Sequence, residues 1–260
     1  MIQKKHRIQF PKNQNFDLAQ DESYFYLKET GEPARKIHFH DYHEIYRIQG
    51  LYEQLFYDRL KCSSPRKVAS ILQSTMDQSR RNLSELRVLD LGAGNGMMGE
   101  ELKKQGISRL VGVDIIDEAY EAMIRDRPDV YDAYYVSDFT NLDSDKEEEI
   151  ASWRLDCMTV VAALGFGDIP PKAFINAFNI IEKTGWVVFN IKETFMDQSD
   201  KTGFSRLIRE LIFSEYLHIY HIERYRHRLS TEGLPLYYYA VAGLKNNDVP
   251  LDFLAEKSLL

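Results

Sequence analysis

The stretch Arg87–Gly106 reads RVLDLGAGNGMMGEELKKQG. A short apolar run is followed by closely spaced glycines, and these by residues that favour a helix. This order of strand, glycine turn and helix is typical of α/β folds, in which the turn presents a helix N-terminus to a ligand. Gly92, Gly94 and Gly96 lack a Cβ atom, so the backbone can bend tightly and approach a ligand closely. We therefore predict an α/β fold with its ligand at this turn.

The glycine pattern fits two classes of ligand. Gly94, Gly96 and Gly99 form the G-x-G-x-x-G of dinucleotide-binding proteins, and Asp114 follows about 20 residues later, where a ribose-binding acid is expected. Read from Asp90, the same stretch is D-x-G-x-G-x-G, which resembles the first motif of class I S-adenosylmethionine-dependent methyltransferases. An acid at that position would repel a pyrophosphate. The methyltransferase is therefore the favoured interpretation, and an NAD(P)-binding Rossmann oxidoreductase is the alternative.

Length and composition limit the class of protein. The 260 residues are 44% hydrophobic, which suits one α/β domain with an appended segment. The net charge of −7 argues against broad electrostatic binding to nucleic acid or to an anionic membrane. Cys62 and Cys157 lie in unrelated contexts and indicate a reducing compartment rather than a disulfide framework. The sequence has neither the pattern of a signal peptide nor an apolar run long enough for a transmembrane helix. We therefore expect a cytoplasmic protein, and one that acts on a small molecule.

Residues 1–84 are expected to form an N-terminal arm followed by lid helices. Residues 1–44 are polar with scattered aromatic residues and predict an irregular arm. The arm contains H-x-H-x-x-H, at His38, His40 and His43, but this spacing matches no common zinc pattern, so we predict no metal site. A first helix is expected from residue 50, and a second with Ser64 as its N-cap.

The first of these helices adds to the resemblance. Residues 45–60, IYRIQGLYEQLFYDRL, resemble the aromatic lid helix of small-molecule methyltransferases. Tyr46 and Tyr52 lie nearest to the two lid aromatics, which implies that they cover the cofactor. The alternative is that both are ordinary core aromatics on an amphipathic helix.

The resemblance also implies a set of residues that bind S-adenosylmethionine. In the turn these are Asp90, Gly92, Ala93, Gly94 and Gly96, and at the ends of later strands they are Asp114, Ile115, Asp138, Phe139 and Ala162. Asp114 would hold both ribose hydroxyls, because a carboxylate offers two acceptors, and the alternative role of helix cap is better filled by Asp117. Asp138 and the Phe139 amide would hold the adenine, unless Asp138 only forms a turn.

The sequence indicates the methyl acceptor less clearly than it indicates the cofactor. Residues 162–168 lack the polar set that many amine and DNA methyltransferases carry beside the reactive sulfur, so a module that binds the cofactor without transferring methyl is a further alternative. Candidates for substrate contacts are Phe166, Asn190 and Lys192. Lys192 could steer an anionic acceptor or form a surface ion pair.

The expected fold is a Rossmann-like, seven-stranded class I methyltransferase sheet with helices on both faces, a terminal antiparallel strand pair and an N-terminal helical lid. The terminal pair is expected at about 216–226 and 236–242. The predicted divisions of the chain are 1–84 for the arm and lid, 85–244 for the S-adenosylmethionine-binding domain and 245–260 for a tail.

Overall fold

The structure is a computed structural model. It describes residues 5–11, 22–29, 31–165, 168–196, 203–250, 252–257 and 259.

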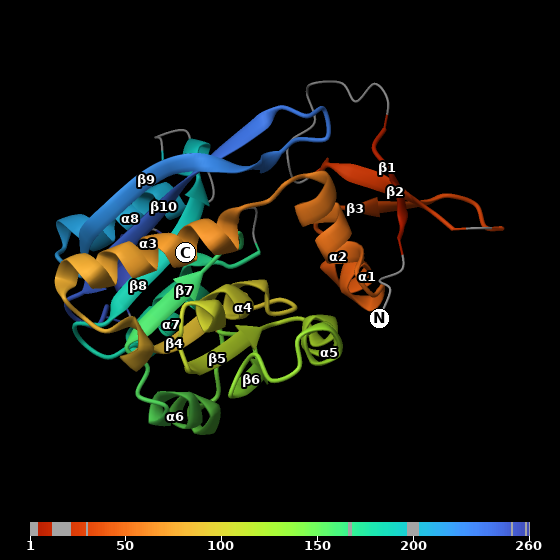
Figure 1. Cartoon of the computed structure of the whole chain (residues 1–260). Helices are drawn as coiled ribbons and strands as arrows, with labels where there is room; N and C mark the ends of the chain where they lie inside the picture. Colours follow the sequence, from red (N-terminus) through yellow and green to blue (C-terminus); the bar gives the residue numbers. More distant parts are fainter. Residues whose placement is uncertain are drawn as a thin grey trace.

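A seven-stranded sheet forms the centre of the molecule, in the order β6-β5-β4-β7-β8-β10-β9 (Figure 1). The strands from β6 to β8 run parallel, whereas β10 is antiparallel to both β8 and β9. The seven strands are β4 (Arg87–Leu91), β5 (Arg109–Asp114), β6 (Ala133–Val136), β7 (Cys157–Val160), β8 (Trp186–Lys192), β9 (Leu217–Leu229) and β10 (Pro235–Lys245). The predicted fold class, with its terminal antiparallel pair, is confirmed.

Helices pack on both faces of this sheet, because successive side chains of each central strand point to opposite faces. Val88 of β4 packs in the core beneath α3 and α4, and the next residue, Leu89, packs in the core beneath α7 and α8. The longer helices are α3 (Ser64–Ser79), α4 (Met97–Lys104), α5 (Asp117–Asp126), α6 (Ser144–Ser152), α7 (Pro171–Ile180) and α8 (Phe204–Phe213). Short turns of helix are Leu83–Glu85, Glu193–Met196 and α9 (Phe253–Glu256). None of the helices in the described ranges combines the length and the apolar character that crossing a membrane requires.

The N-terminal region is not an irregular arm, and that prediction is wrong for the described residues. It contains a three-stranded antiparallel sheet, built from β1 (Arg7–Gln9), β2 (Tyr24–Lys28) and β3 (Arg35–His38). Alternate residues such as Phe25 and Leu27 are fully buried in a separate core, and this alternation stabilises strands rather than loops.

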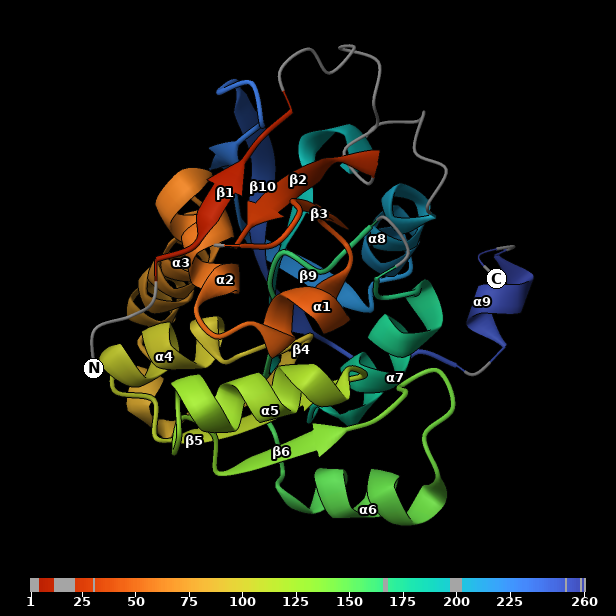
Figure 2. The ribbon, with the colours of Figure 1, turned by 90° about the vertical axis from the view of Figure 1, so that its right-hand side faces the viewer.

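The lid follows this small sheet. It comprises α1 (Tyr42–Arg47), α2 (Leu51–Glu53) and a π-helical continuation, Gln54–Arg59. The apolar stripe predicted from residue 50 onward is buried against the N-terminal sheet. Helix α1 lies against α5, at the edge where the parallel strands end (Figure 2). The next helix, α3, begins one residue earlier than predicted, because Ser64 is inside it and Ser63 is the N-cap.

A β-bulge interrupts the long hairpin of β9 and β10. Leu236 pairs with Arg228 and Tyr237 pairs with Arg226, so His227 is an extra residue on β9. A bulge breaks the alternation of side chains along a strand. As a result, the consecutive residues His227 and Arg228 are both buried.

Candidate functional site

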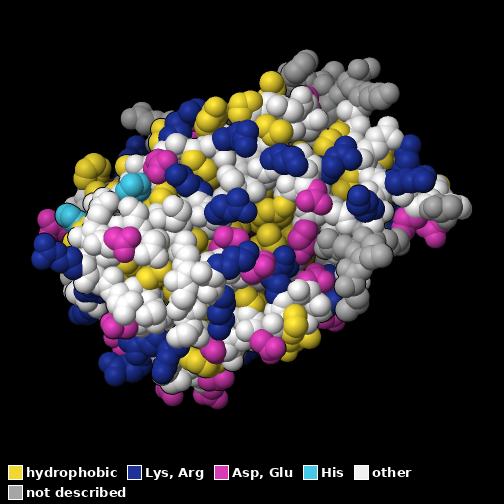
Figure 3. All heavy atoms as spheres, in the orientation of Figure 1, with side chains coloured by type: hydrophobic (Ala, Val, Ile, Leu, Met, Phe, Trp, Pro, Cys, Tyr) yellow, Lys and Arg dark blue, Asp and Glu magenta, His cyan; other side chains and the backbone are white. Residues whose placement is uncertain are grey.

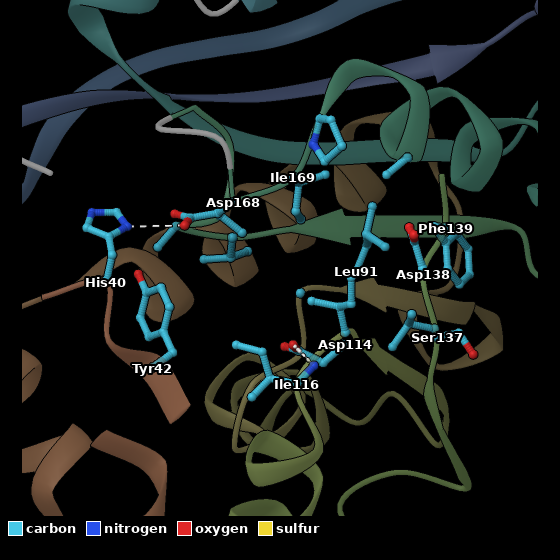
Figure 4. Close-up of a pocket in the computed structure, with 18 of the residues that line it drawn as sticks. His40, Tyr42, Leu91, Asp114, Ile116, Ser137, Asp138, Phe139, Asp168 and Ile169 are labelled. Carbon is cyan, nitrogen blue, oxygen red and sulfur yellow. Dashed lines mark hydrogen bonds and ion pairs between the residues drawn. The ribbon is translucent and has the colours of Figure 1, made fainter. Parts of the chain in front are cut away.

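A cavity of about 290 Å³, here called the site pocket, lies at the carboxyl ends of β4, β5, β6 and β7, beneath the lid. Parallel α/β sheets bind their ligands at this edge. Of the residues predicted from the sequence, those that line it are Tyr46, Tyr52, Gly92, Asp114, Ile115, Asp138, Phe139 and Ala162. Figure 4 shows Asp138 and Phe139 on one side of the pocket, with His40 and Asp168 on the other.

The glycine turn is folded back onto the end of β5. The amides of Gly92 and Ala93 both donate to the carbonyl of Val113 at 2.9 Å, and the amide of Gly96 donates to the Ala93 carbonyl at 3.0 Å. The Gly94 amide donates to Asp114 Oδ2 at 2.8 Å. Gly92, Gly94 and Gly96 all have positive φ, which explains why glycine is needed at each position. The amides of these four residues therefore already donate hydrogen bonds within the protein.

Asp114 connects the turn with the start of α5. Its Oδ1 accepts the Ile116 amide at 3.1 Å, while Oδ2 accepts the Gly94 amide. Burial raises the pKa of Asp114, although these amide hydrogen bonds act in the opposite direction. Helix α5 has no side-chain cap, so neither Asp114 nor Asp117 caps it. Each oxygen of Asp114 has a second lone pair, which leaves two acceptor sites on a carboxylate that lines the pocket.

Asp90, which the resemblance implies as a cofactor-binding residue, is held by hydrogen bonds inside the protein. It is 1% exposed and does not line the pocket. Its carboxylate accepts hydrogen bonds from the Tyr131 hydroxyl at 2.6 Å and the Thr159 hydroxyl at 2.7 Å. Burial raises its pKa to about 6, although both hydrogen bonds oppose the shift.

The stability contributed by Asp90 should therefore depend on pH. Because its pKa is higher in the folded protein than in the unfolded chain, the folded protein binds more protons between about pH 4 and pH 6. Its contribution to the free energy of unfolding then falls as pH rises through that window, by roughly 2–3 kcal/mol, and is constant above it. We expect Asp90→Asn, measured by urea unfolding, to gain stability relative to the wild type between pH 4 and pH 7. The exposed Asp117→Asn is the control, and a difference for Asp90→Asn that does not change with pH would contradict the assignment.

The side of the pocket formed by β6 carries the pair predicted to hold an adenine. Asp138 is exposed, and its Oδ1 accepts both the amide (2.8 Å) and the hydroxyl (2.7 Å) of Thr140. These hydrogen bonds lower the pKa of Asp138, so the carboxylate is stabilised in its charged form. Phe139 is buried, and Ile115 is 59% exposed although it is apolar. The turn interpretation of Asp138 is thus correct, and its carboxylate still lines the pocket.

The lid contributes a column of tyrosines. The rings of Tyr42 and Tyr46 are 6.0 Å apart, and those of Tyr46 and Tyr52 are 4.9 Å apart. All three line the pocket, and the Tyr46 hydroxyl lies directly over Gly94. Tyr46 also packs against the buried alanines of α5, so it is both a packing residue and a wall of the pocket.

Two histidines of the N-terminal region, His40 and His43, contact separate carboxylates. His40 Nδ1 lies 3.1 Å from Asp168 Oδ1, across the pocket, and His43 Nδ1 lies 2.7 Å from Glu118 Oε2. Within the part of the chain that the structure describes, no three His, Cys, Asp or Glu side chains are grouped to hold a metal ion. The sequence does not predict His40 and Asp168 as a pair in the pocket, because they are 128 positions apart. Tyr42 lies in the stretch that is predicted to be an irregular arm.

The loop after β7 is held by a buried polar network. Ala162 has a φ of +58°, and its amide donates to Asn190 Oδ1 at 2.6 Å. Asn190 is fully buried, and its amide nitrogen donates to Ser64 Oγ at 3.0 Å and to the Tyr225 hydroxyl at 2.6 Å. The structure therefore places Asn190 behind the pocket wall. Lys192 lines neither this pocket nor the smaller cavity beside it, and Phe166 lies outside the described residues.

The comparison with known proteins assigns the family. The model of the methyltransferase domain matches residues 59–234, which is more than half of the chain, so the chain belongs to this methyltransferase family. Its fold is that of the class I S-adenosylmethionine-dependent enzymes, as predicted. By sequence, no curated protein matches the chain.

Solved structures of similar fold share little sequence with this chain. The N-methyltransferase NodS from Bradyrhizobium japonicum WM9, in complex with S-adenosylhomocysteine, has a TM-score of 0.55 at 14% identity, covering 80% of this chain and 97% of that one. A putative RNA methyltransferase from Pyrococcus horikoshii has a TM-score of 0.52 at 16% identity, covering 71% and 86%. Magnesium protoporphyrin IX methyltransferase from Synechocystis PCC 6803, with bound S-adenosylmethionine, has a TM-score of 0.50 at 14% identity, covering 70% and 79%. At these identities, the similarity concerns the fold.

Proposed function

We propose that this chain transfers a methyl group from S-adenosylmethionine, bound in the site pocket, to a small-molecule acceptor. The observation that carries the proposal is the glycine turn, whose amides at 92, 93, 94 and 96 are all bonded within the protein. A pyrophosphate is bound by amides that point at it, and these are not free to do so. A nucleoside with a positively charged sulfur needs no such amides.

The residues that line the pocket fit this ligand. Asp114 offers one lone pair on each oxygen to the two ribose hydroxyls, and the apolar side chain of Ile115 is exposed beside it. Asp138 and Phe139 form the side that would receive the adenine, and the lid tyrosines cover the turn. The family match favours this ligand over NAD(P), because the amides at 92, 93, 94 and 96 that would face a pyrophosphate are bonded within the protein.

S-adenosylmethionine supplies a methyl group on an already activated leaving group. The protein has mainly to align the acceptor and to exclude water. Ala162 and Ala163 provide an apolar wall for that purpose, and Tyr42, Tyr46 and Tyr52 close the pocket from the side of the lid.

A small acceptor is supported by charge as well as by enclosure. The chain carries a net charge of −7, and acidic and basic side chains are interspersed on the face shown in Figure 3, rather than gathered into one basic surface. The structures of similar fold include both an N-methyltransferase and a putative RNA methyltransferase, so the fold alone does not select the acceptor.

Calorimetry tests the cofactor. We expect S-adenosylhomocysteine to bind with micromolar affinity and NAD to show no binding. Binding of NAD without S-adenosylhomocysteine would refute the proposal. Catalysis is tested separately by incubating the protein with methyl-labelled S-adenosylmethionine and a metabolite extract. A labelled product is expected, and its absence under broad conditions would instead support a module that only binds the cofactor.

A further inference from the structure

A second, smaller cavity adjoins the site pocket. It measures about 40 Å³ and is here called the rear chamber. Five residues line both cavities and therefore lie between them: His40, Tyr42, Tyr52, Ala162 and Asp168. Among the residues that line only the rear chamber are Cys62, His227 and Arg228. The chamber thus lies directly beyond the apolar wall that faces the proposed methyl donor.

Arg228 is a buried cation without a carboxylate partner. Its side chain is 4% exposed, and its single hydrogen bond to another described residue runs from Nη1 to the Leu229 carbonyl at 3.0 Å. No Asp or Glu in the described ranges lies within ion-pair distance of its guanidinium. Burial lowers the pKa of Arg228, but arginine still remains charged in proteins.

Lys245 is another buried cation of this fold, and groups within the protein compensate its charge. Lys245 is fully buried, and its Nζ lies 2.6 Å from Asp248 Oδ1 and donates to the carbonyls of Phe178 and Asn179 at 2.8 and 3.1 Å. A buried charge that lacks such partners is costly. Among the described residues, Arg228 contacts one carbonyl and the ring of Phe39, 5.4 Å away; the charge of Glu232 acts on it from beyond ion-pair distance, and Arg228 lines a cavity. The arrangement is that of a binding group rather than of a structural ion pair.

The β-bulge on β9 places this charge in the chamber. Because His227 is the extra residue, the alternation of the strand is broken and Arg228 is directed inward together with it. His227 Nδ1 lies 2.6 Å from Ser64 Oγ, and burial lowers the pKa of His227 well below its usual value. His227 is therefore neutral at pH 7. Among the residues that line both cavities, Asp168 is the one acid, and its carboxylate is hydrogen-bonded to His40.

We propose that the rear chamber binds an anionic oxygen group of the methyl acceptor, of the size of a carboxylate, through Arg228. The inference deepens the proposed function and depends on it for the identity of the neighbouring ligand. A cavity needs about 10–15 Å³ to hold one water, so 40 Å³ accommodates a group of only a few heavy atoms. The planar guanidinium matches a carboxylate with two parallel hydrogen bonds. The rest of the acceptor then extends past Tyr42 and Ala162 towards the site pocket.

The test uses calorimetry with acetate and benzoate, their neutral amides and inorganic phosphate as probes, at constant ionic strength. Each probe is titrated into the 260-residue chain, both free and saturated with S-adenosylhomocysteine. We expect each carboxylate to bind at least about 10-fold more tightly than its amide, as a charged hydrogen bond predicts. This preference should be lost in Arg228→Gln and kept in Arg226→Gln, which makes the same change at an exposed residue of the same strand.

Several outcomes would overturn the inference. They are equal binding of acid and amide, no carboxylate binding to either form of the protein, or an unchanged preference in Arg228→Gln. Tighter binding of phosphate than of acetate would overturn the assignment of a carboxylate. If Arg228→Gln does not fold, the comparison of acid with amide in the wild type still tests whether the chamber prefers a carboxylate. Arg228→Lys should keep this preference, with weaker binding of the carboxylate. Failure of S-adenosylhomocysteine to bind would refute the proposed function separately, because the free protein reports on the chamber alone.

Discussion

Replacing Asp114 with alanine is expected to weaken the binding of S-adenosylhomocysteine by about 5- to 150-fold, or roughly 1–3 kcal/mol. The carboxylate has two tasks in the proposed complex. It would accept the ribose hydroxyls, and it already accepts the amides of Gly94 and Ile116. Alanine removes all of these hydrogen bonds at once, so the ligand loses its partner and the glycine turn loses one of the contacts that hold it on β5.

The matched control for this change is Asp117→Ala. Asp117 is an exposed acid at the start of α5, it does not line the pocket, and its loss should leave the affinity unchanged. Calorimetry well below the unfolding temperature gives the dissociation constants, and thermal unfolding reports the stability lost through the unsatisfied amides. Wild-type affinity in Asp114→Ala would remove this residue from the site.

Local sequence patterns predict the central sheet and much of the pocket wall. The segment from Asp90 to Gly96 predicts a strand end and a tight turn. Its glycines mark the turn because the backbone has a positive φ at three of its positions, and glycine adopts such a φ most readily. Since the carboxyl ends of parallel strands meet at one edge of a sheet, residues that follow the other strands, such as Asp114, Asp138 and Ala162, could be assigned to the same pocket.

Contacts between distant segments could not be predicted in this way. The resemblance implies that Asp90 binds the cofactor, but Tyr131 and Thr159 reach its carboxylate from elsewhere in the chain. His40 and Asp168 are separated by 128 positions, and no local pattern pairs them. The strands of the N-terminal region are short and interrupted by polar residues, so their alternation was too weak a signal.

The position of the proposed acceptor-binding cation illustrates the same limit. Lys192 was considered because it follows a parallel strand, whereas the buried cation beside the pocket is Arg228. A strict alternation along β9 would direct His227 and Arg228 to opposite faces, and only the bulge directs both inward. A bulge depends on the register between two strands, which a single segment of sequence does not encode.

Gly94→Ala is the second change expected to have a large effect, since it acts on both the turn and the lid. Gly94 has a φ of +54°, and a Cβ atom there would overlap the hydroxyl of Tyr46. The backbone strain alone should cost about 1–2 kcal/mol of stability. The overlap should in addition push the lid away from the turn, which would weaken S-adenosylhomocysteine binding because the pocket then loses one of its walls.

Two further variants separate strain from overlap. Gly106→Ala also places alanine at a positive φ, +92°, but its Cβ meets nothing within 4 Å, so it should lose stability and keep its affinity for S-adenosylhomocysteine. The double variant Gly94→Ala/Tyr46→Phe lacks the oxygen that the new methyl group would strike, and it should recover part of the lost affinity. If Gly94→Ala binds as tightly as Gly106→Ala, the lid does not cover the cofactor through Tyr46. If both single variants weaken binding equally, the effect comes from backbone strain, and the contact between lid and turn has no role in binding.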